Sequence, residues 1–190
     1  MQLLKDRICA EGRVLPGNII KIDGFLNHQV DIRLMQALGK EFRRLFPDKS
    51  INKILTVEAS GIALAAITAL EFDVPMVFVK KAKSDNIEGG LYQSDIFSYT
   101  YKKKVTLLLA KQWLTQEDNV LVIDDFLANG EAMRGVIEIV GQSGATLAGV
   151  GIAVEKGFQP GGANLREKGV HLESLAIIEG AEDGKIRFRA

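Results

Sequence analysis

The segment Val120–Ala132, VLVIDDFLANGEA, places two adjacent carboxylates between an apolar run and a loop of small residues. Asp124 and Asp125 can accept hydrogen bonds from sugar hydroxyls, which donate. The small residues Ala128–Gly130 let an anion approach the backbone, and the helix expected to begin there offers free N–H groups and a partial positive charge. These residue types favour binding of a sugar phosphate, with the acids on the sugar and the amides on the phosphate.

Two other interpretations of the acid pair stay open at this level. An Asp pair at a strand end can bind Mg²⁺, as in the receiver domains that accept a phosphoryl group. Two neighbouring aspartates can also be solvated side chains in a turn. A receiver-like domain would be phosphorylated at Asp124 or Asp125 and would need further partners along the chain.

A second loop, Glu58–Gly61, also follows an apolar run and precedes an expected helix. By the same logic it is a candidate site for a second anion, with Ser60 as a polar contact. Lys80 and Lys81 directly follow the next apolar run and are candidates for the same anion. The alternatives are an ordinary strand–helix turn with Ser60 as the N-cap, and a lysine pair in a solvated turn.

The elements that must position these residues alternate between apolar runs and helical patterns. Strands are predicted at Lys53–Val57, Val74–Val79, Val105–Leu109, Val120–Ile123 and Ala148–Val154. Helices are predicted over 1–11, over Asp31–Phe46 with Asp31 as the N-cap, over Ile62–Glu71, and over Gly130–Ser143. Near-continuous apolar strands that alternate with helices indicate an α/β fold with a mostly parallel sheet covered on both faces.

Three regions depart from this rhythm. Residues 82–104 are too long for an ordinary connection and predict a mobile lid or a hairpin. Val14–Asp23 predicts one short strand, and the stretch 157–190 predicts strands that join the N-terminal segment in a small hood. We therefore expect a single domain over 1–190, with a core at about 50–155 and a hood from about 1–49 and 156–190.

Whole-chain composition argues against several classes of protein. The 190 residues are 47% hydrophobic and 25% charged, as expected for one globular domain. The formal net charge is +0, so the basic excess typical of nucleic-acid binders is missing. The single cysteine, Cys9, cannot form an internal disulfide, and no Cys/His metal spacing exists, which favours the cytoplasm. No signal peptide or membrane span is recognisable.

The segment VLVIDDFLANGEA resembles the phosphoribosyl pyrophosphate (PRPP) motif of the type I phosphoribosyltransferases. In that motif an apolar strand leads into two acidic residues and then into a loop of small residues. The stretches KIDGFLNHQVD, TVEASGIALA and GIAVEKGFQPG extend the resemblance over nearly the full length. They are similar to the purine branch of the family and, within it, to the enzymes that act on xanthine.

The resemblance implies the type I phosphoribosyltransferase fold and a pentosyltransferase of purine salvage. Such an enzyme would transfer the 5-phosphoribosyl group of PRPP to xanthine, giving xanthosine 5′-monophosphate and pyrophosphate. It also implies Mg²⁺ bound mainly through PRPP, a homodimer, and neither nucleic acid nor membrane as a partner. The open alternatives are another purine specificity, for guanine, hypoxanthine or adenine, and a PRPP-binding transcription regulator on the same fold.

The resemblance also assigns roles to particular residues. Asp124 and Asp125 would be the catalytic pair that binds the ribose hydroxyls. The 5′-phosphate would be bound by backbone N–H groups of Ala128, Asn129, Gly130, Glu131 and Ala132. The purine pocket would involve Ile20, Asn27 and Lys156, and the pyrophosphate loop would involve Ser60 and Lys80. Many members have Thr or Ser where Asn129 and Ala132 stand here, so backbone donors must do more of the binding.

Lys156 suits a base with exocyclic oxygens, because an ammonium group only donates hydrogen bonds. Adenine presents an amino group instead, which would leave the ammonium unpaired. Asn27 carries both a donor and an acceptor for another polar edge of the base. Phe158 is a candidate either for stacking on the base or for the core.

Overall fold

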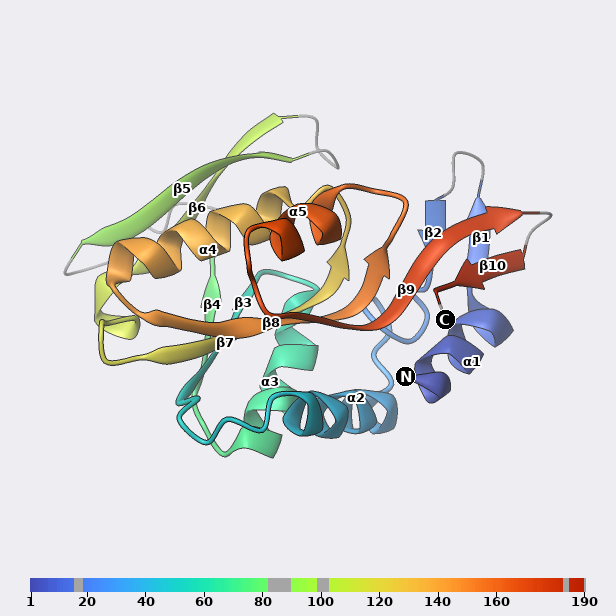
Figure 1. Ribbon diagram of the computed structural model, residues 1–190, viewed down its shortest axis with the longest axis horizontal. Helices are drawn as coiled ribbons and strands as arrows, with labels where there is room; N and C mark the ends of the chain where they lie inside the picture. The colour runs from blue at the N-terminus through green and yellow to red at the C-terminus, as the bar shows by residue number, and fades with distance from the viewer. Residues whose placement is uncertain (16–18, 82–89, 99–102, 183–184, 190) are drawn as a thin grey trace.

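The computed structural model describes residues 1–15, 19–81, 90–98, 103–182 and 185–189 (Figure 1). Its helices are α1 (Gln2–Glu11), α2 (Ile32–Leu45), α3 (Gly61–Phe72), α4 (Glu131–Ser143) and α5 (Gly161–Glu167), with a 3₁₀ turn at Lys111–Trp113. Its strands are β1 (Arg13–Leu15), β2 (Ile19–Lys21), β3 (Lys53–Val57), β4 (Met76–Val79), β5 (Leu91–Ser98), β6 (Lys103–Ala110), β7 (Asn119–Leu127), β8 (Thr146–Lys156), β9 (Leu172–Glu182) and β10 (Lys185–Phe188). None of the described helices is long and apolar enough to cross a membrane.

A six-stranded sheet forms the centre of the molecule, in the order β10-β9-β8-β7-β3-β4. All of its neighbouring strands run parallel except β10, which is antiparallel to β9. The predicted mostly parallel α/β sheet is therefore confirmed. β7 has partners on both edges, with Leu121 paired to Ile54 and to Gly149, and its apolar run Val120–Ile123 is buried.

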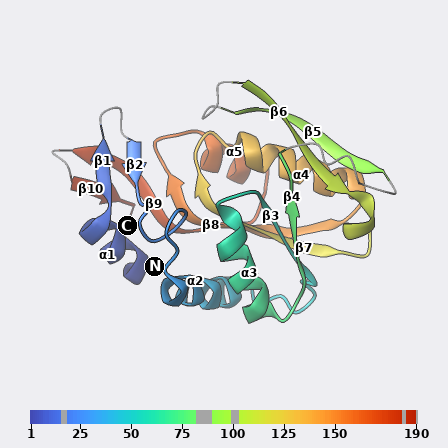
Figure 2. The ribbon, with the colours of Figure 1, turned by 180° about the vertical axis from the view of Figure 1, so that it is seen from behind.

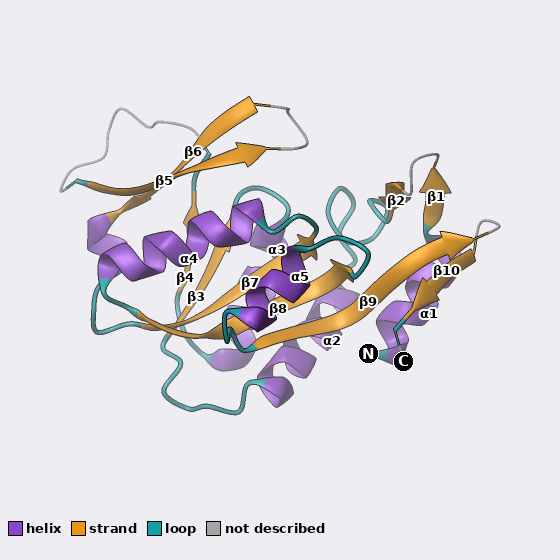
Figure 3. Cartoon of the chain, turned by 45° about the horizontal axis from the view of Figure 1, so that its top comes forward, coloured by secondary structure: helices purple, strands orange, loops and turns teal. Residues whose placement is uncertain are grey.

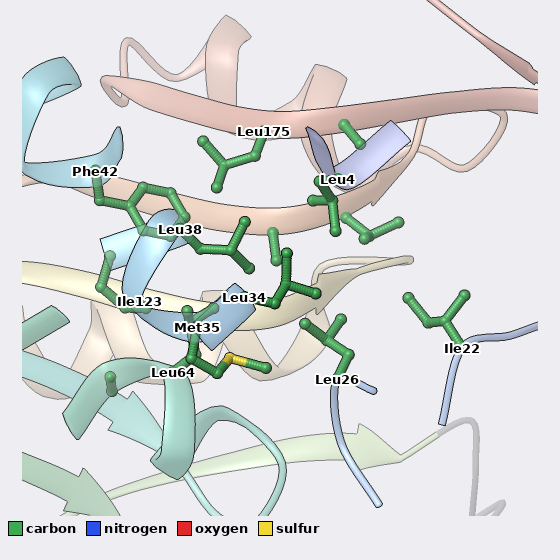
Figure 4. Packing of buried hydrophobic residues seen from close by; sticks show 14 of the residues in the cluster. Leu4, Ile22, Leu26, Leu34, Met35, Leu38, Phe42, Leu64, Ile123 and Leu175 are labelled. Carbon is green, nitrogen blue, oxygen red and sulfur yellow. The ribbon is translucent and has the colours of Figure 1, made fainter. Parts of the chain in front are cut away.

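Helices cover both faces of this sheet. α2 and α3 lie on one face and α4 and α5 on the other (Figures 2 and 3). On the first face Leu38 and Phe42 of α2 pack towards Ile123 of β7 and Leu175 of β9 (Figure 4). The core is thus two apolar layers separated by the sheet, and that rigid support holds the ends of the strands in place.

The predicted helix boundaries agree with the capping chemistry that the structure shows. The Asp31 side chain accepts hydrogen bonds from the backbone N–H groups of Arg33 and Leu34 at the start of α2. Gly144 ends α4 in a left-handed conformation with φ of 76°, which glycine adopts without strain. The N-cap prediction for Asp31 is confirmed, as is the glycine that closes the 130–143 helix.

The 82–104 stretch is in part a hairpin arm. β5 pairs with β6 antiparallel, from Leu91 opposite Ala110 to Ser98 opposite Lys103, and the pair packs over α4 (Figure 1). Residues 82–89 and 99–102 lie outside the described residues, so the predicted lid stays a prediction.

The two ends of the chain meet at one end of the sheet. α1 packs against β9 and β10, and the Met1 amine donates to the Leu175 carbonyl oxygen. The segment 13–21 holds two short strands where the sequence predicted one, because β1 and β2 pair antiparallel. The C-terminal strands β9 and β10 extend the main sheet and reach the N-terminal segment from there. Whether this hood is part of one domain over 1–190 stays a prediction.

Candidate active site

A cleft of about 250 Å³ opens at the carboxyl ends of β3 and β7. Its wall contains the Asp pair, the loop that follows β7 and the loop that follows β3. The opposite side is formed by β5 and β6 through Ile96, Phe97 and Val105. Ligands of open parallel sheets bind at this edge of the strands, and the cleft gathers most of the polar residues that the sequence singled out.

Asp124 and Asp125 belong to β7, which continues to Leu127. The sequence predicted that the strand ends at Ile123 and that the acids follow it. That boundary was wrong, because Asp124 pairs with Ile152 and Phe126 with Val154 in the ladder to β8. The two carboxylates are consequently held by sheet geometry, and their side chains are 7% and 4% exposed. The solvated-turn interpretation of the pair is therefore wrong.

Asp125 is fixed by two side chains from distant parts of the chain. Its Oδ2 accepts from Asn27 Nδ2 at 3.0 Å, and its Oδ1 accepts from the Ser60 hydroxyl at 2.9 Å. A carboxylate has about four lone-pair sites, so two remain for other donors. Asp125 is thus preorganised as an acceptor at the floor of the cleft.

Asp124 has a different environment, since burial raises its pKa well above the usual range and the neighbouring Asp125 carboxylate raises it further. Its Oδ1 accepts from the Asp125 backbone N–H at 3.0 Å. The adjacent acids are therefore unequal: Asp125 is a well-partnered acceptor, whereas the folded protein favours the neutral form of Asp124.

Replacing Asp124 by asparagine is expected to stabilise the protein more at pH 8 than at pH 5. Because the folded pKa of Asp124 is raised, its contribution is full below the unfolded pKa and is lost as the pH rises through the folded value. Asparagine imitates the neutral acid and keeps the acceptor for the Asp125 N–H. Thermal melts should show an increase in Tm over the parent that is larger at pH 8 by about 3 °C.

Asp118→Asn is the matched control for that comparison. Burial raises the pKa of Asp118, but the Lys53 ammonium and the Thr115 backbone N–H outweigh it, so the pKa is lowered overall. Its titration is complete below pH 5, so the change in Tm that this variant causes should be the same at pH 5 and pH 8. An equal Tm difference at both pH values for Asp124→Asn would contradict the buried neutral acid.

The loop after β7 leads directly into α4. Gly130 has φ of 87°, a left-handed conformation that favours glycine, and α4 begins at the next residue. The side chains of Ala128 and Ala132 end at Cβ, so the loop backbone is open to the cleft that they line. The free N–H groups at the start of α4 therefore face a site sized for an anion.

The loop after β3 forms the neighbouring wall. The peptide bond between Glu58 and Ala59 is cis. Ser60 stands at the N-cap position of α3 but makes no capping hydrogen bond, because its hydroxyl donates to Asp125 instead. A Cβ on Gly61 would lie 2.3 Å from Thr56 Oγ1 and 2.6 Å from Asp124 Oδ1, so only glycine fits beside the acid pair. The Glu58–Gly61 loop therefore contacts both acids, through the Ser60 hydroxyl at Asp125 and through Gly61 at Asp124.

The two lysines after β4 face different surroundings. Lys81 lines the cleft, and its backbone N–H donates to Glu58 Oε1. Lys80 lines a separate apolar pocket with Trp113, and its backbone pairs with Leu108 of β6. The structure thus places Lys81 near the acids, although Lys80 was the residue singled out for the pyrophosphate loop.

Of the three residues predicted to bind the base, two lie next to residues of the cleft and one is buried in the core. Asn27 reaches the cleft through Asp125, and the Lys156 ammonium lies 5.6 Å from the centre of the Phe126 ring, which lines the cleft. Burial lowers the pKa of Lys156, as expected for an ammonium group at the partly covered end of β8. Ile20 is buried in the apolar cluster below. Phe158 is 38% exposed, which does not fit a core residue.

Comparison with known proteins shows the class to which this site belongs. Residues 26–163 match the family described as Phosphoribosyl transferase domain. The chain therefore belongs to the phosphoribosyltransferase family.

Two relatives match over nearly their whole length. A Xanthine phosphoribosyltransferase from Lachnoclostridium phytofermentans is 56% identical over 191 residues, which cover 100% of this chain and 98% of the relative. Another from Ruminiclostridium cellulolyticum is 53% identical and covers 99% of each chain.

Solved structures confirm the predicted type I phosphoribosyltransferase fold. A Giardia lamblia APRTase complexed with 9-deazaadenine has a TM-score of 0.76 and 24% identity, covering 92% of this chain and 96% of the other. An adenine phosphoribosyltransferase from Saccharomyces cerevisiae has a TM-score of 0.73 and 20% identity, covering 92% and 99%. At these identities the likeness concerns the fold alone.

Proposed function

We propose that this chain transfers the 5-phosphoribosyl group of PRPP to xanthine, giving xanthosine 5′-monophosphate and pyrophosphate in purine salvage. The observation that carries the proposal is the joining of a buried acid pair and an open helix N-terminus in one cleft. Relatives at 56% and 53% identity, both named Xanthine phosphoribosyltransferase, support the choice of base.

The chain supplies binding and orientation and needs no nucleophile of its own. The purine nitrogen attacks C1′ of the ribose as pyrophosphate leaves, through a state with oxocarbenium character. The remaining acceptor sites of Asp125 bind the ribose hydroxyls, and the amides of 128–132 bind the 5′-phosphate. The contacts to the ribose hydroxyls align C1′ with the base and so lower the entropic part of the barrier, whereas those to the 5′-phosphate hold PRPP in the cleft.

The leaving pyrophosphate would lie near the Glu58–Gly61 loop and Lys81. Both line the cleft on the side of the acid pair, and a lysine ammonium can stabilise charge that develops on the leaving group. Lys81 takes this role in our proposal because its side chain reaches the cleft.

Mg²⁺ fits this arrangement as an ion carried mainly by PRPP. The described residues contain no group of three or more side chains that could hold a metal. The carboxylates of Asp125 and Glu58 line the cleft, and Mg²⁺ commonly binds through one or two carboxylates together with substrate phosphates. When bound, the ion would neutralise charge on the leaving pyrophosphate.

Base recognition would fall to Lys156 and Asn27. The ammonium donates to an exocyclic oxygen of xanthine, and adenine would leave this partly buried charge without an acceptor. Ile20 would add an apolar boundary to the pocket. We further propose that the enzyme is a homodimer that acts in the cytoplasm without nucleic-acid partners.

An assay with PRPP, Mg²⁺ and each purine base tests the proposal. With xanthine as the base, PRPP should be converted into pyrophosphate and xanthosine 5′-monophosphate in equal amounts. The kcat/KM for xanthine should be the highest among the bases. Preference for adenine would contradict the role of Lys156. DNA binding at low salt without turnover of any base would favour the regulator alternative.

A further inference from the structure

A charged cluster built around the buried Glu155 lies behind the loop after β7, outside the cleft. Glu155 at the end of β8 accepts from Arg166 of α5 through both carboxylate oxygens, at 2.8 Å and 2.7 Å. The Ser174 hydroxyl of β9 donates to Glu155 Oε2. Glu155 is only 2% exposed. A bidentate pair of this kind fixes the relative orientation of the two side chains in addition to stabilising their contact. The cluster therefore fixes α5 relative to β8 and β9.

The start of α5 touches the loop after β7 through backbone atoms. The Gly161 N–H donates to the Ala128 carbonyl oxygen at 3.1 Å. A Cβ on Gly161 would lie 2.3 Å from that oxygen and 2.8 Å from the Gly130 nitrogen. Helix and loop are thus in direct contact, and a displacement of α5 moves the loop.

The next glycine connects this contact to the cluster. A Cβ on Gly162 would lie 2.0 Å from Glu155 Oε1 and 2.8 Å from Arg166 Nη1. The ion pair therefore lies directly against the first turn of α5, one residue from the contact with the loop. This continuous set of contacts runs from Glu155 through Gly162 and Gly161 to Ala128.

We propose that Glu155, Arg166 and Ser174 are positioning residues that hold the 128–132 loop in the geometry that binds the 5′-phosphate of PRPP. This inference rests on the proposed function, since it requires PRPP at that loop. The reaction leaves the 5′-phosphate unchanged, and we take its contacts with the loop to be equally strong in the ground state and the transition state, so that they affect KM rather than kcat. Loosening the loop should therefore raise KM for PRPP and leave kcat nearly unchanged.

Arg166→Lys tests the proposal, because lysine keeps the charge but lacks the planar fork. KM for PRPP should rise about tenfold while kcat and KM for xanthine change less than about twofold. Arg44→Lys is the matched control, since Arg44 makes a bidentate pair with Glu41 at 3.0 Å and 2.8 Å on the exposed face of α2. Its kinetic constants should equal those of the parent.

Ser174→Ala keeps the test decisive if Arg166→Lys does not fold. It removes one hydrogen bond to Glu155 and leaves the ion pair, so KM for PRPP should rise about threefold. An unchanged KM for PRPP in a folded variant, or a loss of kcat at constant KM, would overturn the positioning role. A parent protein without PRPP-dependent turnover would contradict the proposed function instead.

Discussion

Replacing Asp125 by asparagine is expected to lower kcat/KM for PRPP-dependent transfer about a hundredfold, the effect of losing about 3 kcal/mol of hydrogen bonding to a charged acceptor. The carboxylate accepts from Asn27 and Ser60, and we propose that its other lone pairs accept from the ribose hydroxyls. An amide in its place presents an N–H₂ group to donors on one side. Initial rates with varied PRPP and saturating xanthine measure the change.

Asp6→Asn is the control for this variant, because Asp6 is an exposed residue of α1 whose partner is Gln2. Its rates should match those of the parent, and both variants should keep the parent's far-ultraviolet circular dichroism. A folded Asp125→Asn protein with normal turnover would remove Asp125 from the sugar site.

Replacing Lys156 by alanine is the second change with a large expected effect. It removes the donors proposed for the exocyclic oxygens of xanthine, so KM for xanthine should rise roughly thirtyfold, or about 2 kcal/mol. KM for PRPP should stay within about twofold, because the side chain lies beside Phe126 and outside the 128–132 loop. Steady-state kinetics with each substrate varied in turn separate the two constants.

Lys40→Ala, at an exposed position of α2, provides the comparison for Lys156→Ala. It should leave both KM values unchanged. If Lys156→Ala raised KM for PRPP as much as KM for xanthine, the loss would reflect a general disturbance of the site rather than base recognition.

Much of the fold could be predicted because the local sequence patterns of its helices and strands agree with the structures that they form in the folded chain. β3 spans Lys53–Val57 as predicted, and α2, α3 and α4 begin and end within one or two residues of their predicted bounds. Apolar strands, an aspartate N-cap and a closing glycine act through neighbouring atoms, so their consequences are visible in the sequence. The Asp pair and the small-residue loop were found for the same reason.

The parts that could not be predicted depend on contacts between distant segments. α5 was missed because Gly161 and Gly162 open it and glycine is a poor helix former, so its position depends on the Glu155–Arg166 pair. Lys80 and Lys81 could not be distinguished, since the pairing of Lys80 with Leu108 decides which side chain faces the cleft.

One hydrogen bond joins the proposed sites of sugar and base recognition, and this limits how the enzyme can be redesigned. Asn27 donates to Asp125 across 98 positions of sequence, so one amide serves both the proposed pocket for the base and the acid proposed to bind the ribose. Substitutions at Asn27 aimed at accepting a new base would disturb catalysis at the same time. An engineering programme that seeks altered base choice should therefore begin at Lys156, whose ammonium lies over the Phe126 ring, and leave the asparagine intact.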